Sequence, residues 1–260
     1  MKHYGLIGKR LGHSWSADYF ARKFAAEGIA ADYRLIELNA LWEGIPKDLD
    51  GYNVTIPYKH AIIPYLDSLD AVAAEIGAVN VVKGGVGYNT DWLGALVALM
   101  DSREDSNSSA SVATSHSGSG DPNALHMSLR SSILAHVGDR KALILGQGGA
   151  AKAVRYALRV MGIESDMISA HGKIEANVSQ YGLIVNATPL GMWPEVETYP
   201  DIDYSVLKPQ QVLFDCVYNP KETEFMRRGK AQGCTVIGGL TMLQAQAEAS
   251  WRIWNTSEKV

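Results

Sequence analysis

The segment from Lys141 to Gly162 constrains the fold of this chain more than any other. It reads as an apolar strand, KALILG, followed by the glycine turn of residues 146–151 and an alanine-rich helix. This order opens a nucleotide-binding βαβ unit, in which glycines let the backbone approach a pyrophosphate and the helix N-terminus offers free N–H groups. The segment is also consistent with a tight turn that binds no ligand.

Strand-like and helix-like segments alternate along the rest of the chain, which predicts an α/β protein. Before residue 100 we expect strands at 4–7, 32–38 and 51–56, and helices at 16–27 and from about 90. After residue 140 we expect further strands at 165–169, 182–186, 212–217 and 235–237, and a last helix at 242–254. A length of 260 residues suits two domains.

Residues 102–132 are rich in serine, with Gly, Asn and Asp among them. Such a segment has too little apolar surface to offset the entropy lost on ordering, so we predict a flexible insertion at a domain boundary. A phosphorylated or partner-binding tail is the alternative.

Composition excludes several classes of partner. A net charge of -4 and the absence of a run of Lys and Arg argue against nucleic acid. No apolar stretch is long enough to span a membrane, and the N-terminus lacks the features of a secretory signal. Cys216 and Cys234 lie in apolar stretches that read as buried strands, which favours a reduced, cytoplasmic setting. The scattered histidines predict no metal site.

Two charged residues stand where α/β proteins gather their ligand sites. The strand that begins near Asn53 runs into Pro57, so Lys59 starts the next element at the carboxyl end of that strand. Asp91 is expected in the first turn of the helix that follows residues 87–90. A solvated lysine and a helix cap at Thr90 or Asp91 explain the same residues, and spacing alone leaves both explanations open.

The residues after the second strand of the βαβ unit usually select the dinucleotide: an acid binds the ribose of NAD, and basic residues bind the extra phosphate of NADP. No acid occurs at residues 167–173, which argues against NAD. His171 and Lys173 are candidates for the phosphate, and an exposed loop without a ligand role explains them equally well.

Six segments together resemble the shikimate and quinate dehydrogenase family. They are His13 to Ser16, Asn53 to Lys59, Ile76 to Asn80, Asn89 to Asp91 with Gly94, Asn186 to Met192, and Gly238 to Ala247. They occur in this order over nearly the whole chain outside the serine-rich segment, with the glycine turn between the fourth and the fifth. The resemblance implies an N-terminal α/β substrate domain and a Rossmann-like dinucleotide-binding domain with a cleft between them.

The resemblance also implies domain bounds and residue roles. The substrate domain would span residues 1–100 and be completed by the helix 241–260, with a linker at 101–138 and an NADP-binding domain at 139–240. Lys59 and Asp91 match the catalytic pair. The matched substrate contacts are Lys59, Asp91, Ser14 and Ser16 for the carboxylate, and Thr55, Asn80, Tyr218 and Gln246 for ring hydroxyls. The matched cofactor contacts are Gly146, Gln147, Gly148, Gly149, Ala150, Met192, Cys216 and Gly239. For Ser16, a helix N-cap is the structural alternative.

The implied activity is the reversible NADPH-dependent reduction of 3-dehydroshikimate to shikimate, with Lys59 as proton donor and Asp91 as the group that orients its ammonium. Alternatives are a quinate or quinate/shikimate dehydrogenase that uses NAD, and a non-catalytic relative that binds a nucleotide or metabolite. We expect a small-molecule substrate and a monomer or homodimer.

Three departures from the family pattern stand out. Ala17 replaces a proline after the second serine, and Gln147 replaces an alanine in the glycine turn. The Asn-Arg-Thr motif of NADP-dependent members is absent, and residues 171–181 are too few for a full crossover. NADP is therefore implied by the family and not by these residues.

Overall fold

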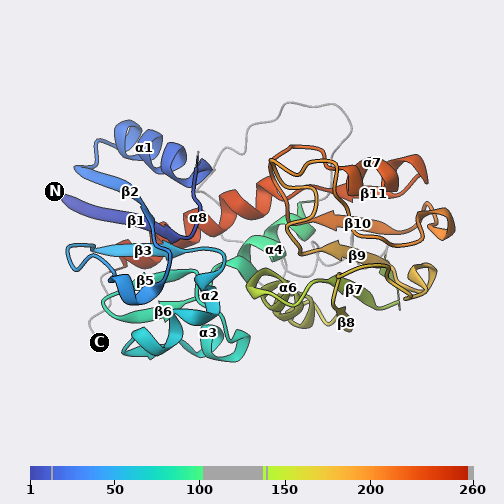
Figure 1. The fold of residues 1–260 in the computed structure, drawn as a ribbon, viewed down its shortest axis with the longest axis horizontal. Coiled ribbons are helices and arrows are strands. Elements are labelled where there is room, and N and C mark those ends of the chain that lie inside the picture. Colours follow the sequence, from blue (N-terminus) through green and yellow to red (C-terminus); the bar gives the residue numbers. More distant parts are fainter. Residues whose placement is uncertain (13, 102–136, 139, 257–260) are drawn as a thin grey trace, which may run out of the picture. The chain divides into compact units, whose positions relative to one another are not determined.

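The protein is described by a computed structural model that covers residues 1–12, 14–101, 137–138 and 140–256 (Figure 1). Two compact units divide the chain: unit 1 contains Met1–Leu93 and Gln244–Val260, and unit 2 contains Gly94–Leu243. The chain passes between the units within two helices, α4 (Asp91–Met100) and α8 (Leu240–Asn255). The serine-rich segment predicted at 102–132 lies outside the described residues.

Unit 1 is built on a mixed six-stranded sheet with the order β2-β1-β3-β5-β6-β4. Its strands are β1 (Lys2–Gly8), β2 (Ala31–Glu37), β3 (Gly51–Val54), β4 (Ser68–Leu69), β5 (Val81–Lys83) and β6 (Val86–Tyr88). β1 pairs in parallel with β2 and β3, whereas β5 runs antiparallel to β3 and β6. The parallel strands therefore bring the residues that follow β1 and β3 to one edge of the sheet.

Short helices connect these strands. Helix α1 (Trp15–Glu27) crosses from β1 to β2 and ends at Gly28, whose left-handed conformation (φ 65°) is one that glycine adopts without strain. α2 (Tyr58–Ala61) and α3 (Ala71–Ile76) lie between β3 and β5, with the 3₁₀ turns η1 (Leu41–Glu43) and η2 (Ile63–Tyr65) nearby in sequence.

The last helix packs on the sheet of unit 1. Trp254 of α8 stacks on Tyr4 with ring centroids 4.8 Å apart, and its indole N–H donates to the carbonyl of Val82 over 3.1 Å. Phe20 and Phe24 of α1 belong to the same buried cluster. Burying this much aromatic surface holds α8 beside the central strands, because the gain in burial grows with apolar area.

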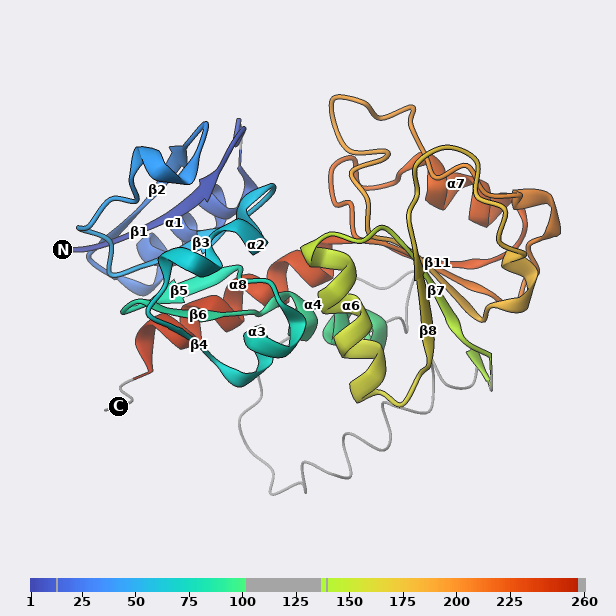
Figure 2. The same cartoon turned by 60° about the horizontal axis from the view of Figure 1, so that its bottom comes forward.

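Unit 2 is a five-stranded, fully parallel sheet with the order β11-β10-β9-β7-β8. Its strands are β7 (Ala142–Leu145), β8 (Ser165–Ile168), β9 (Leu183–Asn186), β10 (Val212–Asp215) and β11 (Thr235–Ile237). Helices α6 (Gly149–Val160) and α7 (Glu224–Ala231) lie on opposite faces of this sheet (Figure 2). Every residue of β7, β9 and β10 is buried, as expected for central strands covered on both sides.

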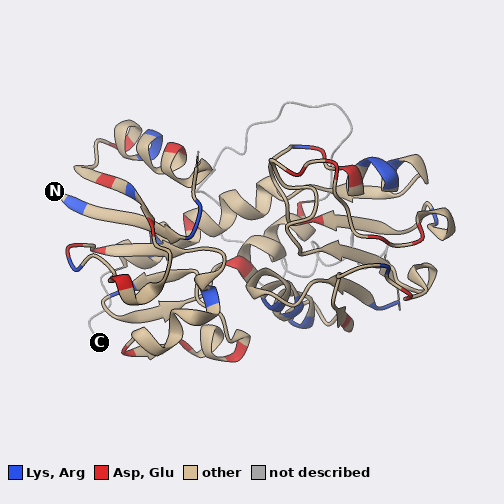
Figure 3. Ribbon diagram, in the orientation of Figure 1, with Lys and Arg blue, Asp and Glu red and all other residues tan. Residues whose placement is uncertain are grey.

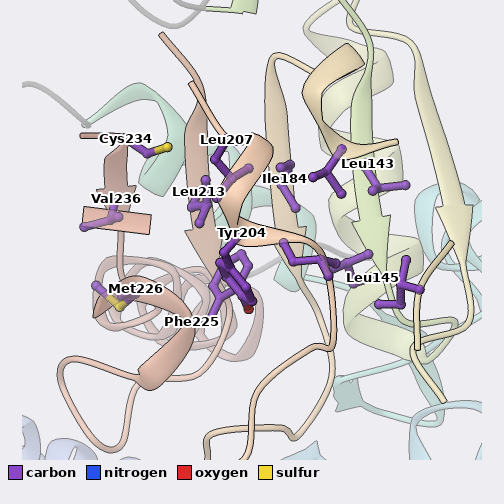
Figure 4. Close-up of a cluster of buried hydrophobic side chains, with 13 residues drawn as sticks. Leu143, Leu145, Ile184, Tyr204, Leu207, Leu213, Phe225, Met226, Cys234 and Val236 are labelled. Carbon is purple, nitrogen blue, oxygen red and sulfur yellow. The ribbon is translucent and has the colours of Figure 1, made fainter. Parts of the chain in front are cut away.

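The core on the α7 side of this sheet contains side chains from three central strands. Leu143, Ile184 and Leu213 meet Phe225 of α7 and Tyr204 of the 3₁₀ turn η4 (Tyr204–Val206) (Figure 4). The chain reverses its direction along the sheet at β7, which lies between β8 and β9. The carboxyl ends of β7 and β9 thus form the point where dinucleotides bind in sheets of this type.

Several predicted bounds are corrected. The strand predicted at 212–217 ends at Asp215, so Cys216 follows the strand and is half-buried, and buried Cys234 precedes β11. The short strands β4 and β6 were not predicted, because two or three residues carry no recognisable alternation. The predicted short link after β8 is confirmed: only the 3₁₀ turn η3 (Val178–Gln180) lies between β8 and β9.

Acidic and basic residues are interspersed over both units (Figure 3). On α7, for example, Arg227 and Arg228 pair with Glu224 over 3.0 and 2.8 Å. None of the helices in the described residues is both long and apolar enough to cross a membrane.

Candidate active site

Lys59 and Asp91 form an ion pair in unit 1. Lys59 is the second residue of α2, two positions after Pro57, and Asp91 is the first residue of α4. The strand predicted at 51–56 ends at Val54. The Lys59 Nζ and Asp91 Oδ2 atoms are 2.7 Å apart, and their side chains are 18% and 6% exposed. A charge-assisted bond this short and this sheltered from water holds the ammonium in one place more firmly than a surface pair would.

The second carboxylate oxygen of Asp91 accepts a bond from Asn80. The distance from Asn80 Nδ2 to Asp91 Oδ1 is 3.0 Å. The backbone N–H of Asp91 donates to the Asn89 side chain, also over 3.0 Å. Both oxygens of Asp91 thus accept from side chains, and one of these donors is the Lys59 ammonium.

Asn80 is held in one orientation. Its Oδ1 accepts the backbone N–H of Thr90 over 2.7 Å, and only the carbonyl end of an amide can accept a hydrogen bond. The NH₂ end must therefore face the other way, where it donates to Asp91 and, over 3.2 Å, to Gln246 Oε1. Three predicted site residues from three separated segments are joined in this way.

Ser14, Ser16 and Thr55 lie in the same unit. Ser14, not Ser16, occupies the N-cap position of α1, which corrects the alternative considered for Ser16, and the Ser14 side chain makes no capping bond. Ser16 lies in α1 and is buried. Thr55 directly follows β3. Among the described residues no hydrogen bond joins these three hydroxyls to the Lys59–Asp91 pair.

The glycine turn of unit 2 leaves its helix without a side-chain cap. Gly146 adopts φ +122°, and a Cβ there would lie 2.8 Å from the carbonyl oxygen of Ala187, in the loop after β9. Gly148 occupies the N-cap position of α6 and offers no capping side chain. Gly149 and Ala150 begin the helix, and Gln147 is exposed.

These features fit a dinucleotide. The first amides of α6 have no side-chain acceptor at the cap, and they carry the positive end of the helix dipole, which suits a pyrophosphate. The turn also lies at the carboxyl end of β7, since the N–H of Gly146 donates to the carbonyl of Ile168 over 2.8 Å. Residues 146–150 would hold the diphosphate.

A second group of predicted residues gathers at the carboxyl ends of β10 and β11. A Cβ at Gly239 would lie 2.4 Å from the carbonyl oxygen of Cys216, so only glycine allows these two backbones to meet. Tyr218 lies two residues further on, and burial raises the pKa of its phenol. Met192 is 38% exposed in the loop after β9. Tyr218 thus belongs to unit 2, whereas the other predicted substrate contacts belong to unit 1.

Asp215 is a functional candidate that sequence reasoning missed. This carboxylate is fully buried at the end of β10 and accepts from Thr223 Oγ1 (2.5 Å), Val217 N (2.9 Å) and Asn186 Nδ2 (3.0 Å). Burial raises its pKa to about 6, and the three hydrogen bonds oppose that rise. Asp215 thereby ties the end of β9 to the loop that carries Cys216 and Tyr218. A lone acid at the end of an apolar strand was the available signal.

Asn53, Thr90 and Ser250 were also missed as members of the site. All three are buried and hydrogen-bonded around Asn80 and Gln246. Asn53 and Thr90 stood inside recognised motifs, whereas Ser250 had no sequence signal, because its neighbours come from distant segments. Among the described residues, no group of three or more His, Cys, Asp or Glu side chains could hold a metal ion.

A dinucleotide turn on a parallel sheet and a sheltered lysine–aspartate pair among neutral amides define a class of protein: a nicotinamide-dependent dehydrogenase built from two α/β units. Residues 6–82 match the family model of the shikimate dehydrogenase substrate binding domain. The shikimate dehydrogenase (NADP(+)) of Moorella thermoacetica is 34% identical over 97% of this chain and 88% of its own length. The chain belongs to the shikimate dehydrogenase family, and the resemblance seen in its motifs is confirmed.

Solved structures agree with this assignment. Shikimate 5-dehydrogenase of Thermus thermophilus, in complex with NADP(H) and shikimate, has a TM-score of 0.75 and 26% identity, covering 98% of this chain and 94% of its own. Quinate dehydrogenase of Corynebacterium glutamicum, in complex with NAD, has a TM-score of 0.74 and 25% identity, with coverages of 98% and 93%. The α/β class and the pairing of a substrate domain with a Rossmann-like domain are confirmed.

Proposed function

We propose that this chain catalyses the reversible, NADP-dependent oxidation of shikimate to 3-dehydroshikimate. The observation that carries the proposal is the bond between Lys59 and Asp91 with Asn80 on the second carboxylate oxygen. In a family of NADP-dependent oxidoreductases, this arrangement supplies a positioned proton donor beside neutral groups that suit a polyol.

Lys59 is the general acid and base of the proposed reaction. In the reductive direction a hydride adds to the ketone carbon, and the oxygen becomes a hydroxyl by taking a proton from the Lys59 ammonium. In the oxidative direction the neutral amine takes the hydroxyl proton as the carbon loses its hydride. The bound NADP supplies the hydride acceptor in that direction and the hydride donor in the other.

Asp91 and the neutral side chains position the substrate. Asp91 holds the Lys59 amine by the 2.7 Å bond and offers a carboxylate to a substrate hydroxyl. Ser14 and Ser16 are proposed to bind the substrate carboxylate; Ser14 is suited to this because its hydroxyl is not used to cap α1. Thr55, Asn80, Tyr218 and Gln246 are proposed to contact ring hydroxyls, since each side chain both donates and accepts.

The cofactor contacts proposed in unit 2 are the residues of the glycine turn together with Met192, Cys216 and Gly239. The close approach of Gly239 to Cys216 supports this, because both present backbone at the carboxyl end of the sheet. The extra phosphate of NADP would be met after β8, where Ser169, His171 and Lys173 are exposed. We further infer a cytoplasmic enzyme that acts as a monomer or homodimer on this small molecule.

Quinate with NAD is the second candidate, favoured by the absence of the Asn-Arg-Thr motif and by the likeness to an NAD-bound quinate dehydrogenase. Steady-state rates with shikimate and quinate, each with NADP and NAD, separate the two. We expect the highest kcat/KM with shikimate and NADP, and a preference for quinate with NAD would reverse the assignment.

Lys59→Ala tests whether the chain is an enzyme at all. We expect kcat to fall by about 10² to 10⁴, while the matched variant Lys208→Ala, in unit 2 and outside the proposed site, keeps wild-type rates. A wild type that turns over neither substrate and binds shikimate as well as Lys59→Ala does would favour the non-catalytic alternative.

A further inference from the structure

We propose that Thr90 and Ser250 are positioning residues: their buried hydroxyls set the direction of the Asn53 and Asn80 amides and hold Gln246 at the site. This inference rests on the proposed function, because it takes Asn80, Asp91 and Gln246 as the groups that meet the substrate. Neither hydroxyl is assigned a contact with substrate, so both act through their neighbours.

Both hydroxyls are sealed from water. Ser250 is 0% exposed and Thr90 1%, and the two amides beside them, Asn53 and Asn80, are 7% and 2% exposed. Ser250 lies in α8 and Asn53 in β3. Thr90 directly precedes α4, and Asn80 directly precedes β5. A polar group buried this deeply is costly unless it is hydrogen-bonded, and each of these four side chains has hydrogen-bond partners within the group.

The direction of the first amide is set from β2. The phenol of Tyr33 donates to Asn53 Oδ1 over 2.8 Å, so the NH₂ end of Asn53 faces inward. There it donates to Ser250 Oγ over 3.0 Å and to the carbonyl of Asn80 over 3.1 Å. Because Ser250 accepts this bond, its single hydrogen is directed to the carbonyl of Gln246, one turn earlier in α8, over 2.8 Å.

Thr90 repeats this arrangement on the other side of Gln246. Its Oγ1 accepts from Asn80 Nδ2 over 3.0 Å, and the nearest acceptor for its hydrogen is the same Gln246 carbonyl, also at 3.0 Å. Asn80 Oδ1 lies farther from it, at 3.4 Å. The two hydroxyl oxygens are 3.3 Å apart. Two hydroxyls thus converge on one carbonyl of α8, and each receives an N–H from a buried amide.

A purely structural role does not require these groups. Replacing both partners of a buried hydrogen bond by apolar groups of the same shape can be nearly neutral for stability. A directional network, by contrast, admits one orientation of each amide, which an apolar core cannot specify. In this site the orientation matters, because the NH₂ end of Asn80 must face Asp91 and Gln246.

Removing the Ser250 hydroxyl leaves one N–H of Asn53 without an acceptor. Removing the Thr90 hydroxyl takes away one of the three acceptors around the Asn80 NH₂ group and one donor to the Gln246 carbonyl. The Asn80 and Asn53 amides are then held by fewer hydrogen bonds, and the substrate-facing groups lose their alignment while the fold persists. We therefore expect Thr90→Val, which keeps the shape, to raise the KM for shikimate about tenfold and to change kcat less. Ser250→Ala should raise the KM for shikimate about fivefold. Thr90→Ser keeps the hydroxyl, so its KM should stay within about threefold of the wild-type value.

A double-mutant cycle and a matched control separate positioning from simple destabilisation. In a Gln246→Ala background, Ser250→Ala should change kcat/KM by less than about twofold, because both substitutions act through one group. Asn255→Ala, which removes an exposed side chain bonded to Trp251 on the same helix, should leave KM unchanged. A lower Tm with an unchanged KM in Thr90→Val and Ser250→Ala, or additive effects with Gln246→Ala, overturns the proposal.

A measurement without turnover keeps this inference separate from the proposed function. Hydrogen exchange of the Asn80 side-chain NH₂, followed by nuclear magnetic resonance, should be slow in the wild type and faster in Thr90→Val. Exchange that does not change in the variant overturns the positioning role, whether or not the wild type oxidises shikimate. Absence of shikimate turnover in the wild type, with faster exchange in the variant, counts against the proposed function alone.

Discussion

The backbone N–H of Thr90 donates to the side-chain oxygen of Asn80 over 2.7 Å, and this bond decides which end of the Asn80 amide faces Asp91. Residues 80 and 90 flank the β5–β6 hairpin, so the hairpin brings the two together. Because the oxygen of the Asn80 amide is held by Thr90, its NH₂ group faces Asp91 and donates to it.

Asn80→Asp should nearly abolish activity. The new carboxylate can still accept from Thr90, but it offers no N–H to Asp91 and places a like charge beside it. We expect kcat/KM for shikimate to fall by at least about 100-fold, the size of effect seen when one aligned polar group is lost. Asn255→Asp, on the exposed face of α8, serves as the control, and equal losses in both variants would contradict the assigned role.

Lys59→Arg tests proton transfer apart from charge. A guanidinium keeps the ion pair with Asp91 but does not give up its proton near neutral pH, so it cannot serve as the base. We expect kcat for shikimate oxidation to fall by about 10² to 10⁴, with shikimate binding by calorimetry retained. Activity within a fewfold of wild type would show that Lys59 binds and does not transfer protons.

Gly146→Ala should weaken the dinucleotide turn. The residue has φ +122°, and the added Cβ would meet the backbone of Ala187 at 2.8 Å, which cannot move without shifting the loop after β9. We expect a loss of about 1–3 kcal/mol of unfolding free energy together with weaker NADP binding by calorimetry. Gly44→Ala, at φ +103° with open space around it, has the backbone strain alone and should leave NADP binding unchanged.

Asp215 should make stability fall as pH rises through the acid range. Its pKa is raised to about 6 in the folded chain from 3.8, so the unfolded chain loses this proton first as pH rises. The stability associated with the protonated carboxyl is therefore present below about pH 4 and is lost as pH rises through about 6, with little change above about pH 7. Urea unfolding should show wild type losing about 2 kcal/mol relative to Asp215→Asn between pH 4.5 and 7.5. A difference that is independent of pH would contradict the raised pKa.

Local patterns were sufficient to predict much of the fold. The run KALILG, the glycines after it and the alanine-rich helix each favour one local structure, and β7 and α6 form there. The position of Asp91 in the first turn of α4 could also be predicted, because it depends on a few neighbouring residues. The paired role of Lys59 and Asp91 came from the family resemblance and not from spacing.

The tertiary structure decided which groups meet. It joined Asp91 to Lys59 and Asn80, placed Ser14 instead of Ser16 at the start of α1, and buried Ser250 between Asn53 and Gln246. No short sequence window contains these relationships, because the partners are up to 197 residues apart. Local propensity and the order of motifs depend on neighbouring residues, and they were enough to predict the main elements and the family. The direction of each buried amide was decided only by folding, since it depends on donors that distant strands and helices bring into contact.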